Sequence, residues 1–289
     1  MLATVPVSVE FVAASGLGRL GSPGGLAAEK GESPQMKQDS DSARAPMLKD
    51  LTIKVLHDNN PCAKGLKTAW GFSALVTGAA RTILFDTGSD GELLLDNMAR
   101  LEVEPNAIDT VVLSHVHGDH TGGLTGFLKE NPHVEVFLPA SFPERFKDTV
   151  RGYGATVVEV EDSREICQDV YTTGEMGTLI KEQALVVRTQ RGLVLLTGCA
   201  HPGVTKMVDR AASSFAQDDI LLVMGGFHLE WATRRRIGKI ITAFESLGVG
   251  YAAPTHCTGD NARELFQQRF GDRYVEVGVG RTVTLSDLK

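Results

Sequence analysis

The chain has 289 residues, of which 42% are hydrophobic and 22% are charged, and its formal net charge is -7. These values are ordinary for a globular protein that buries a full core in one large domain or two small ones. The acidic balance disfavours general nucleic-acid binding, because an acidic surface repels a phosphate backbone at long range. The four cysteines are scattered without a C-x-x-C pair, which disfavours a disulfide framework and favours a reducing compartment.

Residues 1–46 differ in composition from the rest of the chain. The run 15–42 is rich in Gly, Ser, Ala and charged residues without a clean hydrophobic period, which predicts a disordered extension. The chain start lacks a basic segment and Glu10 interrupts its apolar stretch, which disfavours a signal peptide. No apolar run reaches the roughly 18 residues of a membrane helix. We therefore predict a cytoplasmic protein with no membrane partner, whose folded domain spans residues 47–289.

Strand and helix patterns alternate from residue 51 onward. Short apolar or alternating runs predict strands, and apolar residues at helical spacing predict helices. In chain order the strands are 51–56, 70–76, 82–85, 110–113, 134–138, 156–160, 184–189, 193–197, 220–224 and a short one near Tyr251. The helices are 92–101, 122–130, 143–151, 204–214, 232–247 and 262–270, and residues 275–285 have β character. This order predicts an α/β (α+β) fold of two sheets with helices on their outer faces.

A cluster of potential metal ligands follows directly after the strand predicted at 110–113. It has the pattern H-x-H-x-D-H and consists of His115, His117, Asp119 and His120. Side chains two residues apart on an extended segment point to the same side, so the first two histidines can share one ion. The turn through Gly118 then lets Asp119 and His120 face a neighbouring point. Imidazole and carboxylate together suit zinc or another first-row divalent metal.

Three further histidines, His201, His228 and His256, also stand just after predicted strands. Loops at strand ends are where α/β proteins usually place their sites, so as a set these histidines are candidate ligands, although each alone could be a core residue. Asp86 follows the strand 82–85 and could accept a hydrogen bond from the second nitrogen of a metal-bound imidazole. The alternative for Asp86 is a turn-forming residue.

These positions resemble the metallo-β-lactamase superfamily over about residues 48–289. The resemblance implies a four-layer αββα sandwich with a dinuclear metal site at one edge. The ligands that it implies for the first metal are His115, His117 and His201. The ligands that it implies for the second metal are Asp119, His120 and His256, and Asp86 is placed behind them.

The resemblance is closer to a branch whose members are described as dihydropterin ribofuranosyl-aminobenzene phosphate synthases or as metal-dependent hydrolases. The segments that carry it are W-G-F-S at 70–73, T-G-C-A-H-P-G at 197–203, G-G-F-H-L at 225–229 and H-C-T-G at 256–259. Most dinuclear members have an Asp or Cys ligand before the final His, where this chain has His228. Either His228 replaces that ligand or it faces the substrate, and a neutral imidazole there would leave the site more positive. Cys199 and Cys257 we expect to pack the strand ends.

The sequence therefore predicts an enzyme with two divalent metal ions, zinc or else manganese or iron. The leading hypothesis is hydrolysis of a small phosphate-containing or other anionic ester by metal-activated water, with Asp119 and His228 as catalytic residues. A transferase that uses the metals as Lewis acids is the alternative, because the branch name implies a synthase. A third hypothesis is a non-enzymatic metal-binding protein, but six ligands for two metals leave open positions that closed structural sites lack.

The expected partner is a small anionic molecule, with no nucleic acid, and homo-oligomerisation stays open. Three consecutive arginines follow the His228 segment, at Arg234, Arg235 and Arg236. They form either a phosphate-binding patch beside the site or the solvated face of a helix.

Overall fold

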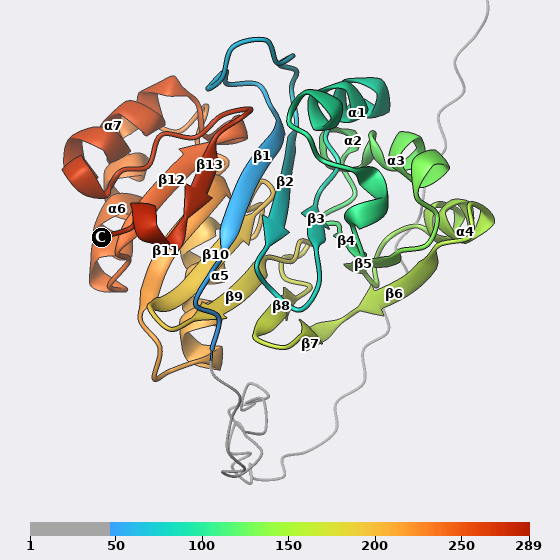
Figure 1. Ribbon diagram of the computed structural model, residues 1–289. Coiled ribbons are helices and arrows are strands. Elements are labelled where there is room, and N and C mark those ends of the chain that lie inside the picture. The colour runs from blue at the N-terminus through green and yellow to red at the C-terminus, as the bar shows by residue number, and fades with distance from the viewer. Residues whose placement is uncertain (1–46) are drawn as a thin grey trace, which may run out of the picture. The chain divides into compact units, whose positions relative to one another are not determined.

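The computed structural model describes residues 47–289, so the disordered extension predicted at 1–46 lies outside the described residues. The described chain forms two β-sheets with helices on both sides of the pair (Figure 1). This arrangement confirms the mixed α/β architecture that the sequence predicts. No helix among residues 47–289 is long and apolar enough to cross a membrane.

The first sheet has seven strands in the order β13-β1-β2-β3-β4-β5-β6. Their bounds in chain order are β1 Thr52–Asp58, β2 Phe72–Thr77, β3 Ile83–Phe85, β4 Thr110–Val112, β5 Glu135–Pro139, β6 Thr156–Val160 and β13 Thr282–Thr284. The strands from β3 to β6 pair in parallel, whereas β2 pairs antiparallel with both β1 and β3. The strands β1, β3 and β4 therefore all end at the same edge of this sheet.

The second sheet has six strands in the order β12-β11-β10-β9-β8-β7. Their bounds are β7 Asp162–Cys167, β8 Val170–Gly174, β9 Leu185–Thr189, β10 Gly192–Thr197, β11 Ile220–Gly226 and β12 Tyr251–Thr255. The strands β10, β11 and β12 pair in parallel, and β9 pairs antiparallel with β10. The carboxyl ends of three strands and the start of β9 consequently share one edge.

Seven α-helices cover the sheets, within the described residues. Those of the first half are α1 Gly91–Arg100, α2 Gly118–Thr121, α3 Leu124–Glu130 and α4 Glu144–Gly152. Those of the second half are α5 Val204–Ser214, α6 Arg234–Ser246 and α7 Asp260–Phe270. Figure 1 shows α1 to α4 beside the first sheet and α6 and α7 on the far side of the second.

Three separate clusters of buried apolar residues account for the layers. One joins the two sheets, because it contains Ile53 of β1 and Leu196 of β10. The second lies between the second sheet and α5 to α7, and the third between the first sheet and α1, α3 and α4. Neighbouring residues of β4 divide between clusters, since Val111 faces the helices and Val112 faces the other sheet. The order of layers is helix, sheet, sheet, helix, which is the predicted αββα sandwich.

Two parts of the predicted secondary structure were wrong. The hairpin of β7 and β8 has no predicted counterpart, because β7 is an edge strand in which only Ile166 is buried. Without alternating apolar residues such a strand gives no period-2 signal. The helix predicted at 122–130 begins two residues later, as α3 at Leu124, and the short helix α2 at Gly118–Thr121 before it was not predicted. A Cβ atom at Gly123 would overlap the carbonyl oxygen of Thr87, so the chain packs there too closely for another residue.

Candidate metal centre

The histidine and aspartate side chains singled out from the sequence gather where the strand ends of the two sheets meet. The loop after β4 carries His115 to His120, and the loop after β3 carries Asp86. The loops after β10, β11 and β12 carry His201, His228 and His256. The sheets approach closely here, because a Cβ atom at Gly198 would overlap the Ser114 hydroxyl. Segments about 170 residues apart in sequence thus reach one place.

The fully buried carboxylate of Asp86 orients two of these imidazoles. Its Oδ2 lies 2.7 Å from His120 Nδ1, and a carboxylate only accepts, so His120 carries its proton on Nδ1. The same oxygen accepts from the Ser114 hydroxyl at 2.7 Å, and that hydroxyl lies 2.9 Å from His115 Nδ1. The Ser114 oxygen then accepts from His115 in turn. In neutral form both imidazoles therefore point an unprotonated Nε2 away from Asp86 and into the site.

His256 is held in the same way by a residue of another strand end. Its Nδ1 lies 2.9 Å from Asn59 Oδ1, just past β1, and the Asn59 amide donates to the His256 carbonyl at 3.4 Å. The Oδ1 atom only accepts, so the His256 proton is on Nδ1 and its Nε2 also carries a lone pair. Asn59 was not predicted as a site residue, although it stands shortly after the strand predicted at 51–56.

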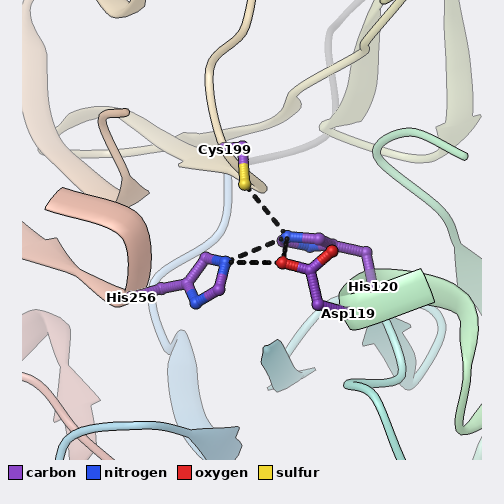
Figure 2. A group of neighbouring side chains, drawn as sticks. All are labelled: Asp119, His120, Cys199 and His256. Carbon is purple, nitrogen blue, oxygen red and sulfur yellow. Dashed lines mark hydrogen bonds and ion pairs between the residues drawn. The ribbon is translucent and has the colours of Figure 1, made fainter. Parts of the chain in front are cut away.

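Four side chains converge on one point in Figure 2: Asp119, His120, Cys199 and His256. The Nε2 atoms of His120 and His256 lie 3.2 Å apart, and Asp119 Oδ2 lies 3.2 Å from the latter and 3.6 Å from the former. Lone pairs that face one another this closely repel unless a positive charge lies between them. A proton on His120 can supply this positive charge. Burial lowers the pKa of His120, but the carboxylate of Asp86 outweighs burial and raises that pKa to about 9.

A second group of ligand atoms adjoins the first. One ring nitrogen each of His115, His117 and His201 lies within 4.8 Å of the others, and the rings of His115 and His120 are 4.3 Å apart between centroids. His201 Nε2 is buried and has no hydrogen-bond partner among the described residues. Burial and the neighbouring imidazole of His228 lower the pKa of His201 to about 4. Burial likewise lowers the pKa of His115 well below its usual range, so both rings are neutral at pH 7.

A second buried carboxylate, that of Glu182, lies beneath the loop after β10. It accepts three successive backbone N–H groups, from Cys199 at 2.9 Å, Ala200 at 2.8 Å and His201 at 2.8 Å. Burial raises the pKa of Glu182 to about 7, although the three N–H donors favour its charged form. The sequence analysis missed this residue, because it stands in the β8–β9 loop with no strand end before it.

The backbone is strained at four of these strand ends. Positive φ angles occur at Asp86, Ala200, His228 and His256, with values of 55°, 59°, 53° and 49°. Among the described residues other than glycine only two more positions have a positive φ. Each such residue costs of order 1–3 kcal/mol, and such strain persists where the surrounding structure enforces it for function. Its concentration here marks this edge as the functional site.

His228 and the two neighbouring cysteines lie at different depths. His228 is exposed, its ring is 4.4 Å from that of His201, and it groups with Cys199 and His201 but not with Asp119. Cys199 and Cys257 are both buried. The Cys199 sulfur lies 3.1 Å from His120 Nε2, whereas the Cys257 sulfur points to the Cys199 carbonyl and hydrogen-bonds His228, which raises the pKa of His228. We expected both cysteines to pack the strand ends. Cys199 instead has its sulfur at the point where the ring nitrogens of His120 and His256 converge.

The residues present fit a pair of divalent metal ions. The site offers imidazole nitrogens, a carboxylate and a thiol, and His201 Nε2 is buried there without a hydrogen-bond partner among the described residues. Each imidazole of His115, His120 and His256 donates its other nitrogen to a polar neighbour, as metal-bound histidines generally do. The ring of Trp70 is half-exposed, and its centroid lies 4.9 Å from that of His256. Trp70 therefore borders the centre just before β2.

The chain is similar in sequence and in fold to several known proteins. Residues 71–201 match the model of the metallo-beta-lactamase superfamily. The 7,8-dihydropterin-6-methyl-4-(beta-D-ribofuranosyl)-aminobenzene-5'-phosphate synthase of Methanocaldococcus jannaschii is 29% identical over 250 residues, which are 71% of this chain and 85% of that protein. A solved structure described as a metal-dependent hydrolase of the beta-lactamase superfamily is 29% identical, with a TM-score of 0.68 over 81% of this chain and 98% of that one.

The fold is also similar to that of a more distant protein. The metallo-beta-lactamase fold protein YhfI of Bacillus subtilis is 15% identical and has a TM-score of 0.59, over 81% of this chain and 99% of that one. At this identity the likeness concerns the fold alone.

Proposed function

The chain is an enzyme with a metallo-β-lactamase superfamily domain, and from that premise we propose that it is a metal-dependent hydrolase of small anionic esters. The observation that carries the proposal is the convergence of ring nitrogens and a carboxylate on two adjoining points. The first ion would be held by His115, His117 and His201. The second would be held by Asp119, His120 and His256, with Asp86 orienting the histidines from behind.

The chemistry follows from what each group can do. When bound, two divalent ions supply Lewis acids and a source of hydroxide near neutral pH. Asp119 is partly exposed, with 20% of its side chain accessible, so it can accept a proton from water at the mouth of the site. His228 is exposed beside His201 and can donate a hydrogen bond to negative charge that develops on the substrate. We therefore assign Asp119 to proton transfer and His228 to the substrate side.

Two features favour an anionic substrate. Burial lowers the pKa of His115 and of His201, so these two imidazoles are uncharged and would not reduce the charge of an ion there. Arg236, at the start of α6, lies close enough that its charge acts on His228. An ester that carries phosphate or carboxylate would be drawn to this positive mouth, against the net negative charge of the whole chain.

The second candidate function is group transfer. It is favoured by one observation, the 29% identity with a protein named as a synthase over 85% of that protein's length. The same ions would then anchor a phosphate and activate the bond that is exchanged. Either reaction needs the same ligands, so only turnover separates them.

The test is turnover on phosphomonoesters, phosphodiesters and cyclic phosphodiesters, with protein loaded separately with zinc and with manganese. Asp119→Ala, prepared in parallel, serves as the blank. We expect metal-dependent hydrolysis of at least one compound that the variant lacks. Absence of hydrolysis by fully loaded protein would count against the hydrolase and favour transfer, which is tested by supplying an aromatic amine phosphate acceptor and assaying its consumption.

A further inference from the structure

The group around the second point contains a side chain that the proposed function does not use. Asp119, His120 and His256 provide three ligand atoms, and structural chemistry of zinc in proteins calls for a fourth ligand or an open position. Between His201 and His256 the sequence has no Gly-Asp motif directly after a strand, and His228 stands where such a ligand would be expected. The structure brings Cys199 there instead, from two residues before His201.

We propose that Cys199 binds the second metal ion as a thiolate, which rests on the metal centre of the proposed function. Its sulfur lies 3.1 Å from His120 Nε2, and one ligand atom each of Cys199, Asp119, His120 and His256 lies within 4.8 Å of the others. These atoms come from both sheets and surround one point, as the side chains of Figure 2 do. On binding, the thiol proton leaves to solvent and a sulfur–metal bond forms.

The backbone around Cys199 is built to hold its sulfur in this place. Its N–H group donates to the buried Glu182 carboxylate at 2.9 Å, and the next residue, Ala200, has a φ of 59°. On the other side, Gly198 lies against the Ser114 hydroxyl, where any side chain would overlap. Cys199 belongs to none of the three apolar clusters of the described chain. Its sulfur instead contacts the ring nitrogen Nε2 of His120, a polar atom.

The inference changes the charge of the site and its choice of metal. A thiolate and the Asp119 carboxylate together balance the charge of a divalent ion, whereas three neutral imidazoles leave the first ion uncompensated. The anionic group of a substrate would then be attracted to the ion at His115, His117 and His201. Thiolate ligands favour zinc over manganese and magnesium, so the second position is expected to select zinc.

Cobalt(II) reports a thiolate ligand without any assay of activity. In the full chain loaded with cobalt, we expect a sulfur-to-cobalt charge-transfer band in the near ultraviolet. The band is expected to vanish in Cys199→Ser and to persist in Cys257→Ser, a matched change of a second buried cysteine that lies in no ligand group. A band absent from the cobalt-loaded wild type, or lost only in Cys257→Ser, would overturn the inference.

A second measurement covers the case in which Cys199→Ser does not fold. X-ray absorption of the zinc-loaded wild type is expected to show a sulfur scatterer at about 2.3 Å besides nitrogen and oxygen at about 2.0–2.1 Å. Cys199→Asp is expected to keep the second ion without the sulfur signal and to bind manganese relative to zinc at least about tenfold better than wild type. Scattering from nitrogen and oxygen alone would reject the thiolate.

The outcomes separate this inference from the proposed function. A thiolate signal in a protein that hydrolyses none of the phosphoesters would keep Cys199 as a ligand and reject the hydrolase. Hydrolysis by protein that shows no thiolate signal would keep the hydrolase and reject Cys199. Failure of cobalt and zinc to bind at all would overturn both.

Discussion

Asp86 and Glu182 are both fully buried carboxylates beneath the candidate centre, yet they stabilise it in different ways. Asp86, on the first sheet, accepts from one backbone N–H but chiefly from side chains, those of Ser114 and His120. Glu182, on the second sheet, accepts only from backbone N–H groups of three successive residues. The first therefore sets tautomers and ring orientations, whereas the second sets the course of a loop.

The difference reflects how each half of the centre delivers its ligands. The half of the site above Asp86 has four candidate ligands in a single six-residue segment, so their positions follow from local spacing once the rings are oriented. The half of the site above Glu182 has its candidate ligands Cys199, His201 and His256, and also His228, on three loops whose backbones have positive φ angles. There the loops themselves must be fixed first, and a carboxylate that binds backbone serves this purpose.

The largest effect is expected when the half above Asp86 loses its ligands. In His115→Ala/His117→Ala the first ion has only His201 left, so we expect its loss and a decrease in turnover of about a thousandfold or more, because several kcal/mol of transition-state stabilisation go with it. Metal content by elemental analysis and turnover on the best substrate check this. As a control, His133→Ala removes an imidazole outside the candidate site. Unchanged metal content in the double variant would refute the assignment.

The next effect distinguishes a chemical role from a structural one in the same half. Asp119→Asn keeps the size of the side chain but removes its charge beside His256 and His120, so the free energy of unfolding should fall by no more than about 1 kcal/mol. Turnover should fall by about 10²–10⁴-fold, because the amide cannot take up a proton. The measurements are kcat and thermal denaturation. Losses of similar size in stability and turnover would indicate that Asp119 only supports the fold.

A pair of isosteric variants compares the two carboxylates directly. Asp86→Asn places an amide donor where Oδ2 accepts from His120, which favours the proton on Nε2 and weakens binding of the second ion by about 10–100-fold. Glu182→Gln leaves one N–H group facing another donor, so the free energy of unfolding should fall by about 1–3 kcal/mol. Metal titration and chemical denaturation of both variants test this. If both changed the same quantity by the same amount, the two carboxylates would have equivalent roles.

The sequence allowed prediction of what depends on local spacing. The H-x-H-x-D-H segment and Asp86 follow directly from strands with clear apolar runs, and the layers follow from the alternation of strands and helices. Helix α5 was predicted with its observed bounds, because its apolar residues have helical spacing and Gly203 and Phe215 flank it. Such features need no knowledge of distant partners.

What could not be predicted depends on the pairing of the two sheets. Glu182 lies in the loop between β8 and β9, where it pairs only through a single bridge to Met176, and its three donors are 17 to 19 residues away in the chain. Cys199 was taken for a packing residue, since nothing in the sequence shows that β10 ends opposite His120. Only the close approach of the two sheets brings that sulfur to the centre.

The smallest effect is expected at Asn59, a neutral residue that accepts a hydrogen bond from the His256 ring as Asp86 does from the His120 ring. Asn59 accepts from His256 Nδ1 at 2.9 Å, but it is only partly buried and uncharged, and neutral hydrogen bonds are roughly half as strong as charged ones. Asn59→Ala should therefore weaken binding of the second ion by about tenfold or less, leaving the first ion and the folded structure unaffected. Competition with a chelator measures both affinities, and Asn60→Ala serves as the neighbouring control. A loss as large as that of Asp86→Asn would mean that orientation of the ring, and not the charge behind it, governs the strength of these ligands.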